Sequence, residues 1–154
     1  MGCNGGLMDN AFWYVKDNGI SLESKYPYKG VGGTCHYNAE TDKALQIKDC
    51  ADVKVNSEKS LMASIAQQPV SVAIQANHLS FQLYKKGVYS GNCGTNLDHG
   101  VLAVGYGTES GKDYYRVKNS WGPSWGQNGY ILIQRTGDGK GKCGIQMVAS
   151  FAVV

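Results

Sequence analysis

The segment Leu97-Asp98-His99-Gly100-Val101-Leu102-Ala103-Val104-Gly105 gives the clearest indication of how this chain folds and where its chemistry lies. The apolar run after His99 predicts a buried strand. A histidine at the mouth of such a strand is held rigidly, with its ring at the strand's edge. Because imidazole titrates near neutral pH, His99 is a candidate for proton transfer. The alternative is an ordinary core or surface histidine, which is how we interpret His36 and His78.

A second segment, Lys118-Asn119-Ser120-Trp121-Gly122, is followed closely by another Trp-Gly pair at Trp125-Gly126. The side-chain oxygen of an asparagine can accept a hydrogen bond from an imidazole N–H and fix its tautomer. A tryptophan over that pair would exclude water and strengthen the bond. The alternative is an aromatic corner that packs the sheet, with Asn119 as a turn residue.

Composition excludes several classes of function. The 154 residues are enough for one ordinary domain with a real core. With 42% hydrophobic and 18% charged residues, the chain is typical of a globular protein. The net charge of +3 comes from scattered Lys and Arg, which argues against a nucleic-acid partner. No apolar stretch approaches 18 residues and the start does not resemble a signal peptide, so we expect no membrane partner.

The five cysteines are Cys3, Cys35, Cys50, Cys93 and Cys143. They form no C-x-x-C pair, and with only three histidines we expect neither a zinc site nor any other metal. Spread singly along a chain rich in Gly and Tyr, they are typical of disulfide halves from an oxidising compartment. The odd count means that at least one is unpaired or lacks its partner.

Hydrophobic periodicity predicts two helices, at about 8–17 and 58–67. Asn18-Gly19 should end the first, and Ser57 or Asn56 should cap the second. Residues 21–44 are polar and rich in turns, so we expect an ordered loop. Strands are predicted at 45–48, 51–55, 69–74, 100–105, 113–119 and 129–135. Several strands after one helix indicate a twisted antiparallel sheet or barrel.

Eight motifs spread through the whole chain resemble, in the right order, the papain-like cysteine endopeptidases. The sequences of these motifs are most similar to the plant vacuolar and cathepsin L-like branch of the family. The motifs are Cys3-Asn4-Gly5-Gly6-Leu7-Met8-Asp9, Tyr26-Pro27-Tyr28, Gln68-Pro69-Val70-Ser71-Val72, Phe81-Gln82-Leu83-Tyr84, Leu97-Asp98-His99-Gly100-Val101, Val104-Gly105-Tyr106-Gly107, Lys118-Asn119-Ser120-Trp121-Gly122 and Trp125-Gly126-Gln127-Asn128-Gly129-Tyr130.

The resemblance implies an α+β, papain-like fold. Residues 1–50 would be the remnant of a mostly helical domain, with one helix and a cleft-lining Gly turn. Residues 51–148 would form an antiparallel β-barrel domain that carries His99 and Asn119 on adjacent strands, within hydrogen-bonding reach. Residues 149–154 would be a C-terminal strap.

The resemblance also assigns roles in peptide hydrolysis. In the family a thiolate attacks the peptide carbonyl, and a histidine partners the thiolate before protonating the leaving amine. His99 matches that histidine and Asn119 the residue that orients it. Trp121 matches the shielding indole, with Trp125 as further support. The family needs no cofactor, and we expect none here.

Substrate-binding positions can be carried over in the same way. Gly5 and Gly6 match the turn whose backbone pairs with an extended substrate, and the Asp98 carbonyl would lie across the same cleft. Positions lining the pocket for the second residue before the cut are all apolar or small here. This implies a preference for Leu, Val or Phe, because a charge would be buried unpaired. The matching residues are Leu7, Met8, Ala73, Gly100 and Val148.

For the cysteines, the resemblance pairs Cys93 with Cys143 in a disulfide. Cys3 and Cys35 match cysteines whose partners lie upstream, outside residues 1–154. Cys50 matches no bridge of the family, so we expect a free thiol. The family's usual compartments are the vacuole, the lysosome and the secreted space.

The pattern breaks at the nucleophile. The family's C-G-S-C-W-type signature and the Gln of its oxyanion hole are absent from residues 1–154. Neither Cys3 nor Cys50 is expected to substitute. The resemblance therefore implies the C-terminal portion of a cysteine endopeptidase, inactive alone. Its partners would be peptide or protein substrates, an N-terminal segment or light chain with the nucleophile, and cystatin-type inhibitors. The alternative is a non-catalytic protein that binds peptides or inhibitors.

Overall fold

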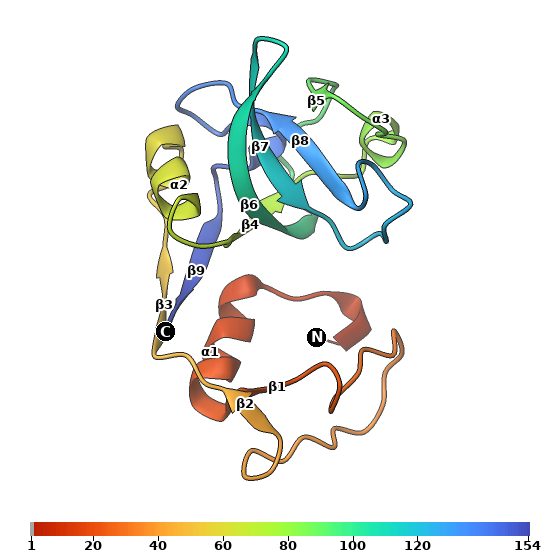
Figure 1. Ribbon diagram of the computed structural model, residues 1–154, viewed down its shortest axis with the longest axis vertical. Helices are drawn as coiled ribbons and strands as arrows, with labels where there is room; N and C mark the ends of the chain where they lie inside the picture. Colours follow the sequence, from red (N-terminus) through yellow and green to blue (C-terminus); the bar gives the residue numbers. More distant parts are fainter. Residues whose placement is uncertain (1) are drawn as a thin grey trace. The chain divides into compact units, whose positions relative to one another are not determined.

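The computed structural model describes residues 2–154, which form two compact units. The first unit runs to Ala51 and includes the terminal Ala152–Val154, and the second is Asp52–Phe151. Figure 1 traces the elements of both. No helix among residues 2–154 has the length and apolar character needed to cross a membrane.

The first unit is built around one helix, α1 (Met8–Asn18), as the periodicity predicted. It ends at Gly19, whose φ of +79° suits glycine and whose N–H donates to the carbonyl of Val15 at 2.8 Å. A short 3₁₀ helix (Gly2–Asn4) precedes it, and strands β1 (Ile20–Ser21) and β2 (Lys43–Leu45) pair antiparallel after it. The strand predicted at 45–48 therefore begins two residues and ends three residues earlier than expected.

Apolar side chains of the first unit are widely exposed. No residue of α1 is buried, Trp13 on the helix is 55% exposed, and Leu7 just before it is 65% exposed. A cavity of about 330 Å³ opens in the same unit, lined mainly by aromatic and other apolar groups. Its lining is Tyr14, Gly19, Ile20, Ser21, Glu23, Tyr26, Cys35 and Tyr37.

The second unit carries most of a seven-stranded sheet in the order β3-β9-β4-β6-β7-β8-β5, with β6 and β7 as its long twisted pair (Figure 1). The strands are β3 (Asp49–Asp52), β4 (Val70–Ile74), β5 (Val88–Tyr89), β6 (His99–Glu109), β7 (Lys112–Lys118), β8 (Tyr130–Gln134) and β9 (Ala149–Val153). The helices are α2 (Glu58–Ile65), α3 (Leu79–Gln82) and the 3₁₀ helix η2 (Lys142–Gly144).

The α+β class is confirmed, but the expectation of an antiparallel barrel needs correction. β5 runs parallel to β8, with Val88 opposite Leu132, so the sheet is mixed. No pairing among residues 2–154 joins the outer strands β3 and β5, and the sheet stays open. Within the expected strap, residues 149–154, the segment Ala149–Val153 forms strand β9 between β3 and β4. Alternating hydrophobicity identifies a strand and its buried face but not its neighbours.

The core of the second unit follows that alternation. In β4, Val70, Val72 and Ile74 are fully buried, while Ser71 and Ala73 between them are half-buried. Helix α2 contributes Leu61 and Ile65, and its Ser57 cap accepts a hydrogen bond from the N–H of Ser60. Strands β6, β7 and β8 add Val101, Ala103, Tyr115, Val117, Ile131 and Ile133. This core gives β4, β6 and β7 a fixed frame from which functional side chains can project.

Candidate active site

His99 is the first residue of β6 and lies opposite Ile74 of β4. Asp98, the residue before His99, is held by two hydrogen bonds. The Asp98 N–H donates to the carbonyl of Ile74 at 3.0 Å, and Asp98 Oδ1 accepts the N–H of Ala76 at 2.7 Å. The backbone that carries the His99 ring is therefore set by β4, as expected for a histidine at the mouth of a buried strand.

Asn119 directly follows β7, the neighbour of β6. Its N–H donates to the carbonyl of Gly129 at 2.9 Å, and only 8% of the residue is exposed. Asn119 Oδ1 lies 2.7 Å from His99 Nε2, so the predicted pair is within hydrogen-bonding reach, with His99 at the start of β6 and Asn119 just after the adjacent β7. The strand register brings the two side chains together.

The hydrogen bonds of Asn119 also fix the state of the imidazole. Asn119 Oδ1 accepts the backbone N–H of Ser120 at 2.8 Å, and a backbone N–H can only donate. The same oxygen must then accept from His99 Nε2, which places a proton on that nitrogen. Nδ1 is left as the ring nitrogen that can exchange a proton with a reacting group. Asn119 Nδ2 is buried without a partner among the described residues.

Trp121 covers the histidine. Its ring stacks on the His99 imidazole with centroids 5.1 Å apart and planes 27° apart, and 38% of Trp121 is exposed. One face of the indole can therefore shield the imidazole–amide bond from water while the other meets solvent. The resemblance suggested this arrangement for Trp121.

An aromatic cluster supports Trp121 from beneath. Trp125 meets it edge-on at 5.2 Å between centroids, and the buried Phe81 does so at 5.7 Å. Trp125 is itself anchored, because its Nε1–H donates to the carbonyl of Gln82 at 2.8 Å. The alternative of an aromatic corner is thus also realised: the same tryptophans pack the unit and cover His99. Phe81 and Gln82 lie in the motif Phe81-Gln82-Leu83-Tyr84, but nothing in the sequence marks them as supports for Trp121.

The other predicted substrate residues fall into two groups. In the second unit Ala73 lies opposite Gly100, and the Ala73 N–H donates to the carbonyl of Val148 at 3.0 Å, so these three are neighbours. The remaining four are consecutive in the first unit. Gly5, with φ of +91°, and Gly6 form the turn before α1; Leu7 is its exposed N-cap and Met8 its first residue. Added methyl groups at Gly5 or Gly6 would meet nothing within 4 Å.

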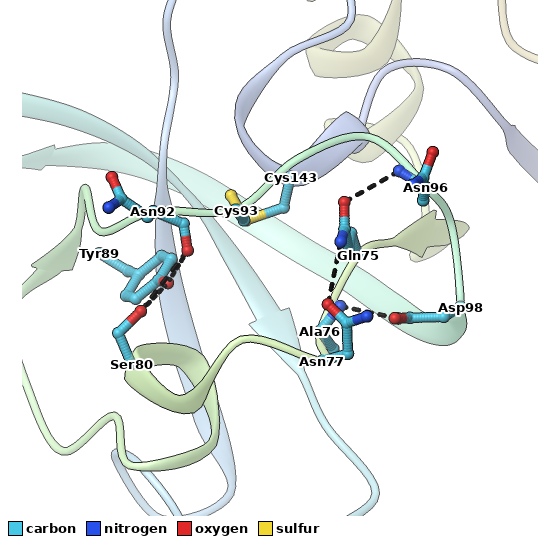
Figure 2. Close-up of a disulfide and its surroundings, with 10 residues drawn as sticks. All are labelled: Gln75, Ala76, Asn77, Ser80, Tyr89, Asn92, Cys93, Asn96, Asp98 and Cys143. Atoms are coloured by element: carbon cyan, nitrogen blue, oxygen red, sulfur yellow. Dashed lines mark hydrogen bonds between the residues drawn. A yellow bond between two sulfur atoms is a disulfide. The ribbon is translucent and has the colours of Figure 1, made fainter.

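The predicted disulfide between Cys93 and Cys143 is present and links the segment before His99 to η2 (Figure 2). These are the two cysteines of the second unit, so no free thiol lies in the unit that holds His99. Cys3 and Cys35 are exposed free thiols and Cys50 is a half-buried one, in agreement with the expectation for Cys50. The second unit can thus hold and orient an acid–base, but it does not itself supply a thiolate.

Known proteins are similar to this chain in sequence and in fold. The family model described as papain family cysteine protease matches residues 1–153. The oryzain beta chain of Oryza sativa subsp. japonica is 57% identical over 152 residues, which cover 97% of this chain and 33% of that protein. The KDEL-tailed cysteine endopeptidase CEP2 of Arabidopsis thaliana is 50% identical over 154 residues, which cover 99% of this chain and 43% of that protein. This chain thus spans about a third to under half of these relatives.

A solved structure agrees along the full length of the chain. The bromelain protease from Ananas comosus, determined in complex with the E64 inhibitor, superposes with a TM-score of 0.94 at 41% identity. The match covers 100% of this chain and 72% of that chain. The open mixed sheet with its few helices is therefore a papain-like arrangement.

Proposed function

This chain belongs to the papain family of cysteine proteases, and from that premise we propose that it is the C-terminal portion of a cysteine endopeptidase. The reaction is hydrolysis of peptide bonds by thiolate attack. His99 forms an ion pair with the thiolate through Nδ1 and then protonates the leaving amine. The observation that carries the proposal is the hydrogen bond between His99 Nε2 and Asn119 Oδ1, together with the stacking of Trp121 on the His99 ring.

The nucleophile comes from a segment other than residues 1–154, and this chain alone does not catalyse the reaction. One feature of the sequence and one of the structure support this. The C-G-S-C-W-type signature is absent, and the cysteines of the unit that holds His99 are bonded to each other. Without a thiolate, an imidazole and its shield accelerate peptide hydrolysis only slightly, because the covalent route is closed.

The decisive test is active-site labelling with E-64, the inhibitor present in the bromelain structure. We expect no specific labelling of the 154-residue chain. Addition of an N-terminal segment that carries the C-G-S-C-W-type signature should give one equivalent of label on that segment's cysteine and peptidase activity. His99→Ala in the same mixture is the matched control, and it should abolish activity while leaving the partner thiol countable by denaturing titration.

Two other results would contradict the proposal. Label that appears on Cys3, Cys35 or Cys50 with peptidase activity in the lone chain would show a local nucleophile. Tight binding of peptides or a cystatin-type inhibitor, with no activity in any mixture, would favour the non-catalytic alternative. Both results differ from the expected gain of activity on complementation.

The exposed apolar surface of the first unit is where we propose that the N-terminal segment or light chain binds. Trp13 and Leu7 are each more than half exposed and α1 buries none of its residues, so this unit exposes apolar surface that a bound segment could cover. The aromatic cavity beside α1 has Cys35 in its lining, so an incoming segment can add a disulfide there as it fills the space. Cys3, also a free exposed thiol, offers a second bridge.

The substrate is a peptide or protein with an apolar side chain at the second position before the cut. Ala73, Gly100 and Val148 are neighbours, and none of them carries a charge. In the second unit, the Asp98 carbonyl is the candidate for pairing to the substrate backbone. Leu7, Met8 and the Gly5-Gly6 turn of the first unit remain substrate-binding candidates from the family resemblance. A positional peptide library should favour Leu, Val or Phe there, because a buried charge would lack a partner. A preference for Arg would contradict this pocket.

We place the protein in the endomembrane system or outside the cell, in the vacuole, lysosome or secreted space. The Cys93–Cys143 disulfide supports an oxidising compartment, and one relative is named as KDEL-tailed. Co-localisation of the full precursor, fused to a fluorescent protein, with vacuolar or secretory markers would support this placement. A cytosolic signal would contradict it.

A further inference from the structure

A buried glutamine lies beside the segment that leads to His99. Gln75 directly follows β4 and is 7% exposed. Residues 92–98, the approach segment, form no helix or strand, yet they deliver the chain to His99. We propose that Gln75 is a positioning residue for His99, which acts by fixing the approach segment. The inference rests on the proposed acid–base role of His99.

The Gln75 amide is used at both ends, as Figure 2 shows. Its Oε1 accepts the backbone N–H of Asn96 at 2.9 Å, and its Nε2 donates to Asn77 Oδ1 at 2.9 Å. The orientation of the amide is determined, because the Asn96 N–H can only donate. The backbone N–H of Gln75 donates to the carbonyl of Cys143 at 2.9 Å. One residue thus joins the end of β4, the approach segment and η2.

The fit around the Gln75 oxygen is close. A methyl group added at Gly94 would lie 2.5 Å from Gln75 Oε1, well inside contact distance. The approach segment can therefore come close to Gln75 because Gly94 has no side chain. This close approach allows the hydrogen bond between the Asn96 N–H and Gln75 Oε1. Ordinary packing of a surface loop would not need glycine at this point.

Three attachments hold the approach segment in sequence. Cys93 is bonded to Cys143, Asn96 is held by Gln75, and Asp98 is held by the N–H of Ala76 through its carboxylate (Figure 2). Gln75 supplies the middle attachment. Without it the Asn96 N–H must turn to water, and the chain between Cys93 and Asp98 has no side-chain restraint among these contacts. The residue that follows Asp98 is His99, whose ring must stay aligned with Asn119 to keep its proton on Nε2.

The test measures the imidazole directly. In the ¹⁵N-labelled 154-residue chain, nitrogen shifts of His99 report how its neutral form divides between the Nε2–H and Nδ1–H tautomers. His36→Gln and His78→Gln identify the signal. We expect the Nε2–H tautomer to predominate in the parent chain and Gln75→Leu to lower its ratio to the Nδ1–H tautomer at least threefold. In the enzyme completed with its nucleophile segment, Gln75→Leu should reduce kcat roughly tenfold to a hundredfold with KM little changed.

Further variants separate positioning from stability. Gln75→Glu keeps an acceptor for Asn96, and the exposed Asn77 can turn its amide to donate, so this variant should restore kcat to within a few-fold. Gly94→Ala should displace the Gln75 oxygen and reproduce the tautomer change, which keeps the test open if Gln75→Leu does not fold. Tyr89→Phe is the matched control, because it removes a hydrogen bond to the Asn92 carbonyl of the same segment, before Cys93. It should leave the tautomer ratio and kcat unchanged.

An unchanged His99 tautomer ratio in folded Gln75→Leu and Gly94→Ala would overturn the inference. So would equal losses in Tyr89→Phe, since the effect would then be general loosening. The tautomer readout needs no peptidase activity, so this inference can fail while E-64 labelling supports the proposed function. Conversely, failed labelling would leave the tautomer result intact as a statement about His99.

Discussion

His99 Nε2 lies 2.7 Å from Asn119 Oδ1, although the two residues are twenty positions apart in the chain. The antiparallel pairing of β6 with β7 accounts for this, because it brings the start of one strand to the end of the other. The Ser120 N–H holds the same oxygen in place. The pair therefore presents an imidazole whose proton is fixed on one nitrogen and whose other nitrogen is open to chemistry.

Replacement of Asn119 tests that pair. In the completed enzyme, Asn119→Ala should lower kcat/KM by roughly tenfold to a hundredfold. This loss is smaller than the roughly 10²–10⁴-fold rate contribution of general acid–base catalysis, because the His99 imidazole remains. Asn119→Asp is the informative companion. A carboxylate at this position stabilises the imidazolium and should shift the alkaline limb of the pH–rate profile upward. An unchanged profile in both variants would show that Asn119 does not orient His99.

The two tryptophans should respond differently to truncation. Trp121 is 38% exposed, so Trp121→Ala should lower kcat by admitting water to the His99–Asn119 bond while changing thermal stability little. Trp125 is buried, and Trp125→Ala should cost about 3–5 kcal/mol of unfolding free energy. Trp125→Phe isolates the bond from Nε1 to Gln82 and should cost about 1 kcal/mol. Urea unfolding and steady-state kinetics on the three variants measure both effects. Equal stability losses in the two alanine variants would contradict this division.

The elements that sequence alone predicted are those with a local physical cause. Helix α1 ends at Gly19 because only a positive φ closes it there, and β4 is identified by alternation of its buried residues. The two-residue β5 escaped prediction, because it is too short to show a period and depends on pairing with β8. Nor did the sequence show that the terminal residues form a strand, β9, because its place between β3 and β4 depends on tertiary pairing.

The residues of the candidate site also differ in how far the sequence could identify them. His99 and Asn119 stood out because their residue types carry chemistry and sit beside recognisable motifs. Gln82 and Gln75 did not stand out. Gln82 acts through its backbone carbonyl, and the side-chain oxygen of Gln75 accepts the backbone N–H of Asn96, 21 positions away. Neither contact leaves a pattern in a single sequence. The buried position of Gln75 at the end of a predicted apolar strand is the signal that could have drawn attention to it.

Loss of the Cys93–Cys143 disulfide should destabilise the chain by about 3–4 kcal/mol, as expected for a bridge that closes a 50-residue separation. The double variant Cys93→Ser, Cys143→Ser avoids a free thiol and can be compared with the parent by chemical unfolding. Cys50→Ser is the matched control and should change the unfolding free energy by less than about 1 kcal/mol, because Cys50 is unbonded. A larger loss in the control than in the double variant would contradict the assignment.

Tyr115 should make the second unit sensitive to alkali. It is fully buried, and its hydroxyl donates to Gln146 Oε1 at 3.0 Å. Burial first, and then the Glu58 carboxylate, raise the pKa of Tyr115 above its ordinary value of 10.0. Because the unfolded chain ionises near that value while the folded chain stays neutral, its contribution to stability is complete below about pH 10 and declines above it. Melting curves from pH 8 to 11.5 should show a shallower alkaline decline for Tyr115→Phe, from a lower starting Tm. Parallel declines would contradict this.

The exposed apolar surface of the first unit should make the lone chain bind dye and associate. Trp13 and Leu7 are largely exposed, and α1 buries none of its residues, so this unit lacks the core that a stable fold of its size requires. We expect strong 1-anilinonaphthalene-8-sulfonate fluorescence and concentration-dependent association of the purified chain. Both should fall when the N-terminal segment is added. Trp13→Gln should reduce dye binding in the lone chain and weaken complementation, whereas Leu79→Gln, at an exposed apolar position of the second unit, should spare complementation. A monomer with one sharp melting transition and no dye binding would show that the first unit is stable without a partner segment.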